Sequence, residues 1–515
     1  MMKLVSSLVS KSNKAAKLYN KVTSSKGDAP DPDAPAFVLG REVGGHDGSL
    51  QRRVASTPWL TYRRGFPPLV PASHTSDVGW GCMLRVGQMA LGQTVLRMFL
   101  GPDWTLPPSA VEALLADDSS GSEGASSPAP SALLQAPPER PPLPDMYYEI
   151  LRWFADTPDP SVPYSIHNIS SLGCRLGVNI GDWFAPTTIG NCLQYLVNVH
   201  APGGLAMYVA YDATVYLADL ESAATAPVGT LNPMADAMWV VSPTSPVASE
   251  GVPDLPHLYT YGKDPGGIVH AHTAPPSSVP PRQRERTGSE QGSAPSDPGD
   301  AASASSSTSS LPPSPPSVSE TPALDVPEWA AHLLSPSAET ATAWRPTLVF
   351  VPVRLGLQAL NDVYIEPIKA VFEFPQTIGV LGGKPRGALF FIGVQGDSLV
   401  YLDPHSVQPV SFVSPDTPPS AFSYQCSNPR VVPVSKIDPS MAFCFYCASP
   451  ADVVDLIVRL NDVQARFGTG VLSIVPGQSP SSSMAVVDAA SSSASSAPPP
   501  SSDLASWEDD DFEFI

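Results

Sequence analysis

Beyond the first 36 residues, three stretches of the chain have apolar residues at helical spacing. Residues 144–156 (PDMYYEILRWFAD) and 187–200 (TTIGNCLQYLVNVH) both have this spacing, which predicts helices. The longest stretch is residues 83–100, MLRVGQMALGQTVLRMFL, and predicts a helix packed on a core. Its apolar stripe is formed by Leu84, Leu91, Val95 and Met98.

Four later runs are rich in β-branched and aromatic residues, which is typical of strands. They are LAMYVAYD (205–212), TLVFVPVRLG (347–356), ALFFIGVQGDSLVYLDPH (388–405) and MAFCFYCAS (441–449). Because helices come first and strands mostly follow, the order favours an α+β fold over an alternating βαβ fold.

Three segments rich in Pro, Ser and Ala interrupt this pattern, at about residues 108–144, 242–343 and 477–502. They are poor in aromatic and β-branched residues and cannot bury a core, so we expect them to be disordered. The pieces between them are together large enough for one domain. Surface loops tolerate extra length at little cost in free energy, so two of these segments are interpreted as insertions.

The predicted organisation has three parts. A basic arm covers residues 1–36, one domain covers residues 37–476, and a disordered tail covers residues 477–515. The ordered pieces of the domain are expected at about 37–107, 145–241 and 344–476. From Met1 to Gly27 the arm has six Lys and no acid, with apolar residues at helical spacing. A membrane-surface helix, a transit peptide and a loose solvated arm all remain open for it.

Charge and cysteine content narrow the class of protein. The net charge is −20, with 29 basic and 49 acidic residues, which argues against nucleic-acid binding. Six cysteines in 515 residues are too few for a disulfide framework and indicate a reducing compartment. No apolar run is long enough to span a bilayer.

One cysteine stands where a helix begins. Cys82 lies in SDVGWGCMLRVGQM, residues 76–89, just before the longest predicted helix. The free N–H groups and the dipole of a helix N-terminus stabilise a thiolate. Cys82 is therefore a candidate nucleophile, with a buried core thiol as the alternative.

A nucleophilic cysteine needs a base, and His405 is the best placed of the nine histidines. It lies in VYLDPHSVQP, directly after a predicted strand, two residues beyond Asp403. In an extended chain the two side chains point the same way, so the carboxylate can hold the imidazole. An ordinary Asp-Pro-His turn is the alternative. The C-x-x-C at Cys444 and Cys447 has no second ligand pair nearby, so we expect buried thiols rather than a metal site.

These segments closely resemble the autophagy cysteine proteases, or autophagins, which are papain-like enzymes. The most specific matches are GWGCMLR and LDPH. PWLTYRRGFPPL, IGDWFAPTTIGNCL, FPQTIGVLGGKP and IDPSMAFCFYC also match, in order, so the resemblance covers most of the ordered pieces. It implies a papain-like domain with a small finger-like subdomain.

The resemblance implies a role for each matching residue. Cys82 matches the nucleophile, His405 the general base and Asp403 its orienting carboxylate. Tyr62 in WLTYRRGFP matches a phenol that helps form the oxyanion hole, together with the backbone N–H of the nucleophile. Trp183 in GDWFAP and Pro385 in GGKP match residues that wall and cover the cleft. A core aromatic and a plain turn are the alternatives for these last two.

The resemblance also implies the reaction. Autophagins cut the ubiquitin-like autophagy modifier after a glycine and release it from phosphatidylethanolamine. No cofactor and no metal are implied, and we expect a cytoplasmic monomer with at most transient contact with autophagic membranes. A non-catalytic adaptor that holds the modifier, and a related Cys-His-Asp hydrolase such as a deubiquitinase, are the alternatives.

The chain ends in SWEDDDFEFI. An aromatic residue, two spacers and an aliphatic residue after a run of acids resemble the short motif that docks autophagy modifiers. Phe512 and Ile515 would fill two pockets while the backbone adds a strand to the partner's sheet. An acidic tail that only keeps the chain soluble is the alternative.

Overall fold

The computed structural model describes the residues that form one compact unit of the chain. The described ranges are 28–31, 34–44, 48–120, 143–159, 161–228, 326–335, 343–384, 387–410 and 421–480.

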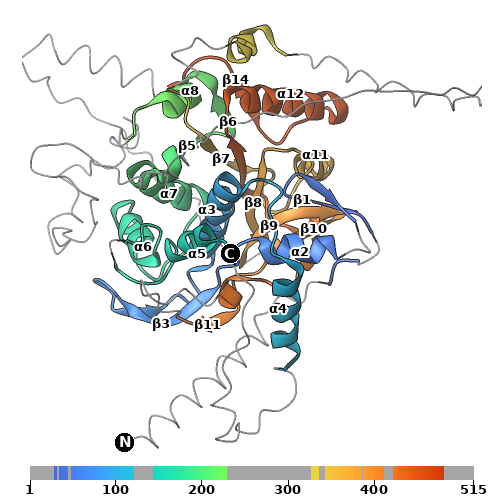
Figure 1. Ribbon diagram of the computed structural model, residues 1–515. Coiled ribbons are helices and arrows are strands. Elements are labelled where there is room, and N and C mark those ends of the chain that lie inside the picture. The colour runs from blue at the N-terminus through green and yellow to red at the C-terminus, as the bar shows by residue number, and fades with distance from the viewer. Residues whose placement is uncertain are drawn as a thin grey trace, which may run out of the picture. The chain divides into compact units, whose positions relative to one another are not determined.

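A nine-stranded sheet forms the centre of this unit (Figure 1). Its main path runs in the order β12-β10-β9-β8-β13-β7-β5, and β1 and β2 extend it from β9. All neighbours are antiparallel except β5 and β7, which pair in parallel. The strands are β1 (Ala36–Val38), β2 (Arg41–Val43), β5 (Ala206–Val209), β7 (Thr347–Arg354), β8 (Thr377–Lys384), β9 (Gly387–Gln395), β10 (Ser398–Leu402), β12 (Arg430–Pro433) and β13 (Ser440–Cys447).

Helices cover both faces of the sheet (Figure 1). A central strand is therefore buried on both sides, which explains its consecutive apolar residues. Every residue of β9, for example, is buried. Alternate residues serve opposite faces. Phe390 joins the core on the side of α3, and Leu389 and Phe391 join the core on the side of α12. Burying one such phenylalanine contributes about 1.5–3 kcal/mol.

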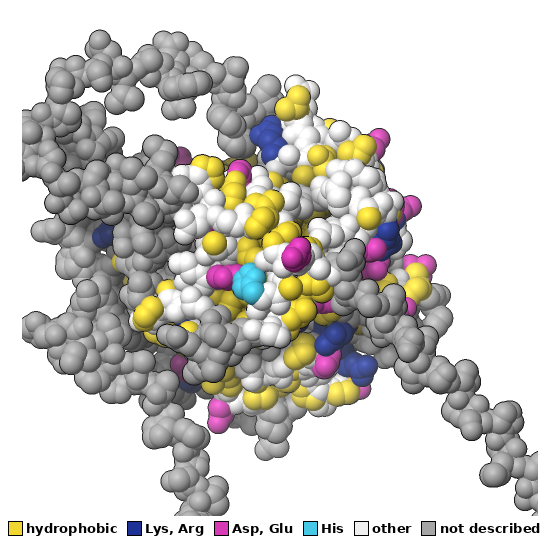
Figure 2. Space-filling view, turned by 90° about the horizontal axis from the view of Figure 1, so that it is seen from above, with side chains coloured by type: hydrophobic (Ala, Val, Ile, Leu, Met, Phe, Trp, Pro, Cys, Tyr) yellow, Lys and Arg dark blue, Asp and Glu magenta, His cyan; other side chains and the backbone are white. Residues whose placement is uncertain are grey.

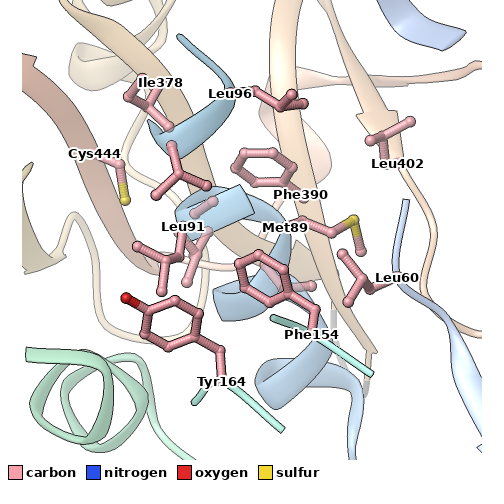
Figure 3. Packing of buried hydrophobic residues seen from close by; sticks show 14 of the residues in the cluster. Leu60, Met89, Leu91, Leu96, Phe154, Tyr164, Ile378, Phe390, Leu402 and Cys444 are labelled. Carbon is pink, nitrogen blue, oxygen red and sulfur yellow. The ribbon is translucent and has the colours of Figure 1, made fainter. Parts of the chain in front are cut away.

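The helix α3 (Cys82–Leu100) lies against one face of the sheet, between α5 (Asp145–Arg152) and α7 (Pro186–His200). Figure 3 shows Met89 and Leu91 of α3 beside Phe390 of the sheet in one apolar core. Gly87 lets α3 approach α7 closely, because a Cβ at this position would lie 2.4 Å from Cγ1 of Ile189. The helix that carries Cys82 is therefore held on several sides.

The opposite face is covered by α8 (Leu217–Thr225), α11 (Ile365–Val371) and α12 (Pro450–Phe467). Ser449 begins α12 with a capping box, in which its side chain and that of Asp452 bond each other's backbone N–H. Gly468 ends it in the left-handed conformation that suits glycine.

The remaining elements are short. Two small sheets consist of β3 (Tyr62–Leu69), β4 (His74–Ser76) and β11 (Val407–Pro409), and of β6 (Thr214–Tyr216) and β14 (Ser473–Val475). The other helices are α2 (Ser49–Ser56), α4 (Pro108–Ser120), α6 (Ile166–Arg175) and the 3-10 turns η2 (Pro202–Gly204), η4 (Glu328–Leu334), η5 (Asp362–Tyr364), η6 (Ala421–Tyr424) and η7 (Val434–Lys436).

The α+β prediction is confirmed, and each of the three predicted helices and four predicted strand runs corresponds to observed elements. The bounds of the predicted disordered segments need correction. The helix α4 lies within 108–144, η4 lies within 242–343, and the described chain continues into the predicted tail as far as residue 480. The turn η4 is ordered because Ala330 and Leu333 are buried in the core that α12 also lines.

The η4 turn also makes a polar contact, since Nε2 of His332 lies 2.7 Å from Oε1 of Glu221 on α8.

Figure 2 looks down on this end of the molecule, where hydrophobic side chains lie across the middle of the face and Lys and Arg lie toward its rim. No helix among the described residues is both long enough and apolar enough to cross a membrane.

Candidate active site

Cys82 is the first residue of α3 and is almost fully buried, with 4% of its surface exposed. Gly81 precedes it at the N-cap, and no side chain caps this helix end. A Cβ on residue 81 would lie 2.6 Å from Cβ of Asp77, so the turn into the helix requires glycine. The uncapped N–H groups are therefore free to stabilise negative charge on the sulfur.

Asp403 and His405 follow directly after β10, as the sequence predicts. Nδ1 of His405 lies 2.6 Å from Oδ1 of Asp403, and the backbone N–H of His405 donates to the same oxygen at 3.0 Å. The turn is anchored by Trp59, whose Nε1–H donates to the carbonyl oxygen of Asp403 at 2.8 Å. The carboxylate thus fixes both the tautomer and the direction of the imidazole.

Strand β3 brings Tyr62 to the same place. It pairs in parallel with β11, with Val407 opposite Tyr62, and the backbone N–H of Tyr62 donates to the carbonyl oxygen of Pro404 at 2.8 Å. The rings of Tyr62 and His405 have centroids 5.4 Å apart. A residue early in the chain is therefore held beside the Asp-Pro-His turn by backbone pairing.

The thiol of Cys82 has three hydrogen-bonding neighbours: His405, the backbone N–H of Ala388 and the hydroxyl of Tyr62. Burial alone would raise the pKa of Cys82. The hydrogen bond and charge of His405, followed by the two other donors, outweigh burial and bring the pKa below its usual value.

The pKa of His405 shifts in the opposite direction, upward. Burial disfavours the imidazolium, but the hydrogen bonds with Asp403 and Cys82 and the charges of both outweigh it and raise the pKa of His405 to about 9. Both shifts favour the ion pair of a thiolate and an imidazolium over the neutral pair. This pair can attack a carbonyl carbon and then protonate a leaving amine.

Trp183 lies beside the loop that leads into Cys82. Its Nε1–H donates to the carbonyl oxygen of Gly79 at 2.8 Å, while 52% of the residue remains exposed. The indole is therefore half-exposed and fixed to the loop that precedes Cys82.

The β8–β9 hairpin reaches the imidazole from another side. A Cβ on Gly387 would lie 3.1 Å from Cε1 of His405, so a side chain at this position would press on the imidazole. Pro385, predicted to cover the cleft, lies outside the described residues, as do Phe512 and Ile515 of the tail.

Ala388 and Trp59 contact the site residues, and the sequence analysis did not predict either of them. Ala388 contributes a backbone N–H, and because almost every residue has one, its residue type gave no indication of this role. Trp59 stands in PWLTY, three residues before Tyr62, and a tryptophan so close to a candidate site residue was the available signal.

The other described histidines in the helical region have different environments. Nδ1 of His200 lies 2.9 Å from the hydroxyl of Tyr164, and burial lowers its pKa to about 4. Nε2 of His167 lies 2.8 Å from the carbonyl oxygen of Pro67. Neither is among the hydrogen-bonding neighbours of the Cys82 thiol.

Cys444 and Cys447 are both buried, as predicted. Three positions apart on one strand, they belong to the cores on opposite faces of the sheet, so they cannot bind the same ion. Within the described ranges there is no group of three or more His, Cys, Asp or Glu side chains that could hold a metal.

Comparison with known proteins places this geometry in context. A family model described as the peptidase C54 catalytic domain matches residues 48–459. "Cysteine protease ATG4A" of Gallus gallus is 28% identical over 428 residues, which are 82% of this chain and 81% of the relative. The Homo sapiens protein of the same name is 28% identical over 426 residues, covering 82% and 77%. "Cysteine protease ATG4B" of Gallus gallus is 26% identical over 431 residues, covering 83% and 80%.

Proposed function

Because this chain belongs to the peptidase C54 family and is a cysteine protease, we propose that it cuts the ubiquitin-like autophagy modifier after a glycine near the modifier's C-terminus. We also propose that it releases the modifier from phosphatidylethanolamine. The observation that supports this most is the convergence of Cys82, His405, Asp403 and Tyr62, where the pKa of the thiol is lowered and the pKa of the imidazole is raised.

In the proposed reaction the Cys82 thiolate attacks the carbonyl carbon of the scissile glycine. The carbonyl oxygen becomes an oxyanion and accepts hydrogen bonds from the backbone N–H of Cys82 and the hydroxyl of Tyr62. His405 gives its proton to the leaving nitrogen as the C–N bond breaks, which leaves a thioester. Neutral His405 then takes a proton from water, whose oxygen attacks the thioester and regenerates the thiolate.

The same steps serve both substrates. A precursor peptide bond and the bond to phosphatidylethanolamine are both amides, so each leaving amine needs the proton that His405 holds. A cut after glycine would suit a cleft walled by the half-exposed indole of Trp183, because only glycine lacks the Cβ that would clash with such a wall. Pro385 is proposed to cover the substrate tail.

The tail of the enzyme is proposed as a second contact with the modifier. Phe512 and Ile515 would dock in two pockets, and the acids before them would suit a basic surface. Action on the lipid-linked form requires only transient contact with the membrane. We propose that the enzyme acts as a monomer in the cytoplasm and needs no cofactor.

The first test is cleavage of purified modifier precursors that carry a C-terminal reporter. Wild-type enzyme is expected to cut after the glycine, Cys82→Ala is expected to be inactive, and the control Cys174→Ala, which changes an exposed thiol on α6, is expected to retain activity. Liposomes that carry the lipid-linked modifier test release in the same three proteins.

The alternatives give different results. An enzyme that binds the modifier and cleaves neither substrate would support the adaptor function. Cleavage of ubiquitin fusions in preference to modifier precursors would support a deubiquitinase. Loss of modifier binding in a Phe512→Ala, Ile515→Ala double variant that still cleaves a short peptide would support tail docking.

A further inference from the structure

Four charged side chains are buried together behind the N-terminus of α3. Arg63 is 1% exposed, Asp77 0%, Arg85 1% and Asp156 3%. Two acids and two bases balance one another, as buried charges require. Such clusters often contribute little net stability, so a role other than stability is worth seeking for this one.

Asp77 holds the loop that leads to Cys82. Its carbonyl oxygen accepts from the backbone N–H groups of Trp80 at 3.2 Å and Gly81 at 2.9 Å. Gly81 in turn accepts from the backbone N–H of Arg85 at 3.0 Å, which continues the bonding into the first turn of α3. The position of this loop, and so of the thiol, depends on where Asp77 is fixed.

The carboxylate of Asp77 joins two elements. Oδ2 accepts from Nε of Arg85 at 2.7 Å, one turn beyond Cys82 on α3. Oδ1 accepts from the backbone N–H of Arg63 at 2.6 Å, and Arg63 follows Tyr62 on β3. The backbone of Tyr62 is in turn bonded to Pro404, next to His405.

We infer that Asp77 is a positioning residue that sets the distance between the Cys82 thiol on α3 and the Tyr62–His405 side of the site. It touches none of the reacting atoms and acts through Arg85 and the backbone of Arg63. The inference rests on the proposed role of Cys82 as nucleophile. It adds a residue whose carboxylate holds the first turn of α3 at a fixed position relative to β3.

Asp156 provides a matched control. Its Oδ1 accepts from Nη1 of Arg85 at 2.7 Å, so it belongs to the same buried cluster and carries the same charge. Among the described hydrogen bonds it makes none to β3 or to the loop at 76–81. Asp77→Asn and Asp156→Asn therefore remove the same charge near Arg85, and only the first change affects the connection between α3 and β3.

The test measures alkylation of Cys82 by iodoacetamide from pH 5 to pH 10, followed by mass spectrometry of the peptide that contains it. In Asp77→Asn the rate near pH 6 is expected to fall about tenfold, the change in thiolate fraction for a one-unit shift. With modifier precursor, kcat is expected to fall about 10- to 100-fold, as for a misplaced catalytic group, with KM unchanged. Asp156→Asn is expected to lower the melting temperature and to keep the wild-type alkylation profile.

An alkylation profile in Asp77→Asn that equals the wild-type profile would overturn the inference, as would an equal shift in Asp156→Asn. If Asp77→Asn does not fold, Arg85→Lys replaces it, because lysine keeps the charge and lacks the fork that reaches both carboxylates. It is expected to show the same shift, and a wild-type profile would overturn the inference. A wild-type Cys82 no more reactive at pH 6 than Cys174 would overturn the proposed nucleophile as well.

Discussion

The ring of Tyr62 meets the imidazole of His405 edge-on, with centroids 5.4 Å apart and ring planes at 86°. The hydroxyl of Tyr62 also hydrogen-bonds to the sulfur of Cys82. One side chain therefore contacts both Cys82 and His405, and its removal should affect both the ionisation of the sulfur and the rate of the reaction.

Tyr62→Phe is expected to lower kcat by about 10²- to 10³-fold, the usual effect of removing one oxyanion donor. KM should change little, because the hydroxyl acts on charge that develops in the transition state. Steady-state cleavage of the precursor measures both constants. Tyr164→Phe is the control, since it removes another buried hydroxyl, one that lies 2.9 Å from His200. Equal losses in the two variants would contradict the assignment.

Activity is expected to depend on pH in a bell shape. Activity should rise with pH as the Cys82 thiol ionises. A free thiol titrates at about pH 8.5, and the site lowers the pKa of Cys82, so the rise should come at a lower pH. It should fall as the His405 imidazolium loses its proton near pH 9. Measuring kcat/KM from pH 5 to pH 10 at constant ionic strength checks both limbs. An activity that first appears above pH 8 would indicate an ordinary thiol.

Asp403→Asn is expected to shift the alkaline limb of that profile to lower pH. The carboxylate helps to raise the pKa of His405, so its loss lets the imidazolium deprotonate earlier. The amide also permits the wrong tautomer, and kcat should fall by as much as about 10⁴-fold. The control is Asp397→Asn, which removes an exposed carboxylate paired with Lys369. An unmoved alkaline limb would show that Asp403 does not set the charge of His405.

Trp183→Ala is expected to raise KM for the precursor about tenfold, equivalent to about 1.4 kcal/mol of binding. Alkylation of Cys82 by a small reagent should stay close to wild type, because the indole bonds the Gly79 carbonyl and not the sulfur. Tyr211→Ala removes a comparably exposed aromatic residue, 45% exposed against 52% for Trp183. A change in alkylation with no change in KM would assign Trp183 to the loop instead of the substrate.

Local features of the site were predictable from the sequence. Apolar spacing predicts α3 and places Cys82 at its N-terminus. Adjacency predicts the Asp403–His405 pair. The pairing of Cys82 with His405 rests on elimination among the histidines and on family resemblance, because the contact between the start of α3 and the turn after β10 depends on the tertiary fold.

Other features had no local signal. The apolar residues of η4 look the same in sequence whether they are solvated or packed, and only the presence of α12 decides between the two. The buried cluster around Asp77 was missed for a similar reason. Its members are ordinary charged residues in the sequence, and their burial follows from the way β3, α3 and the turn at Asp156 come together.

The order of the elements along the chain has a consequence for synthesis. By the time α7 has left the ribosome, Cys82 and α3 are complete, but every strand from β7 to β13 and the imidazole of His405 are still to be made. The apolar face of α3 has no sheet to pack on during that interval, and the thiol lacks the neighbours that ionise it. The nascent enzyme should therefore have no protease activity until the chain has been synthesised beyond His405.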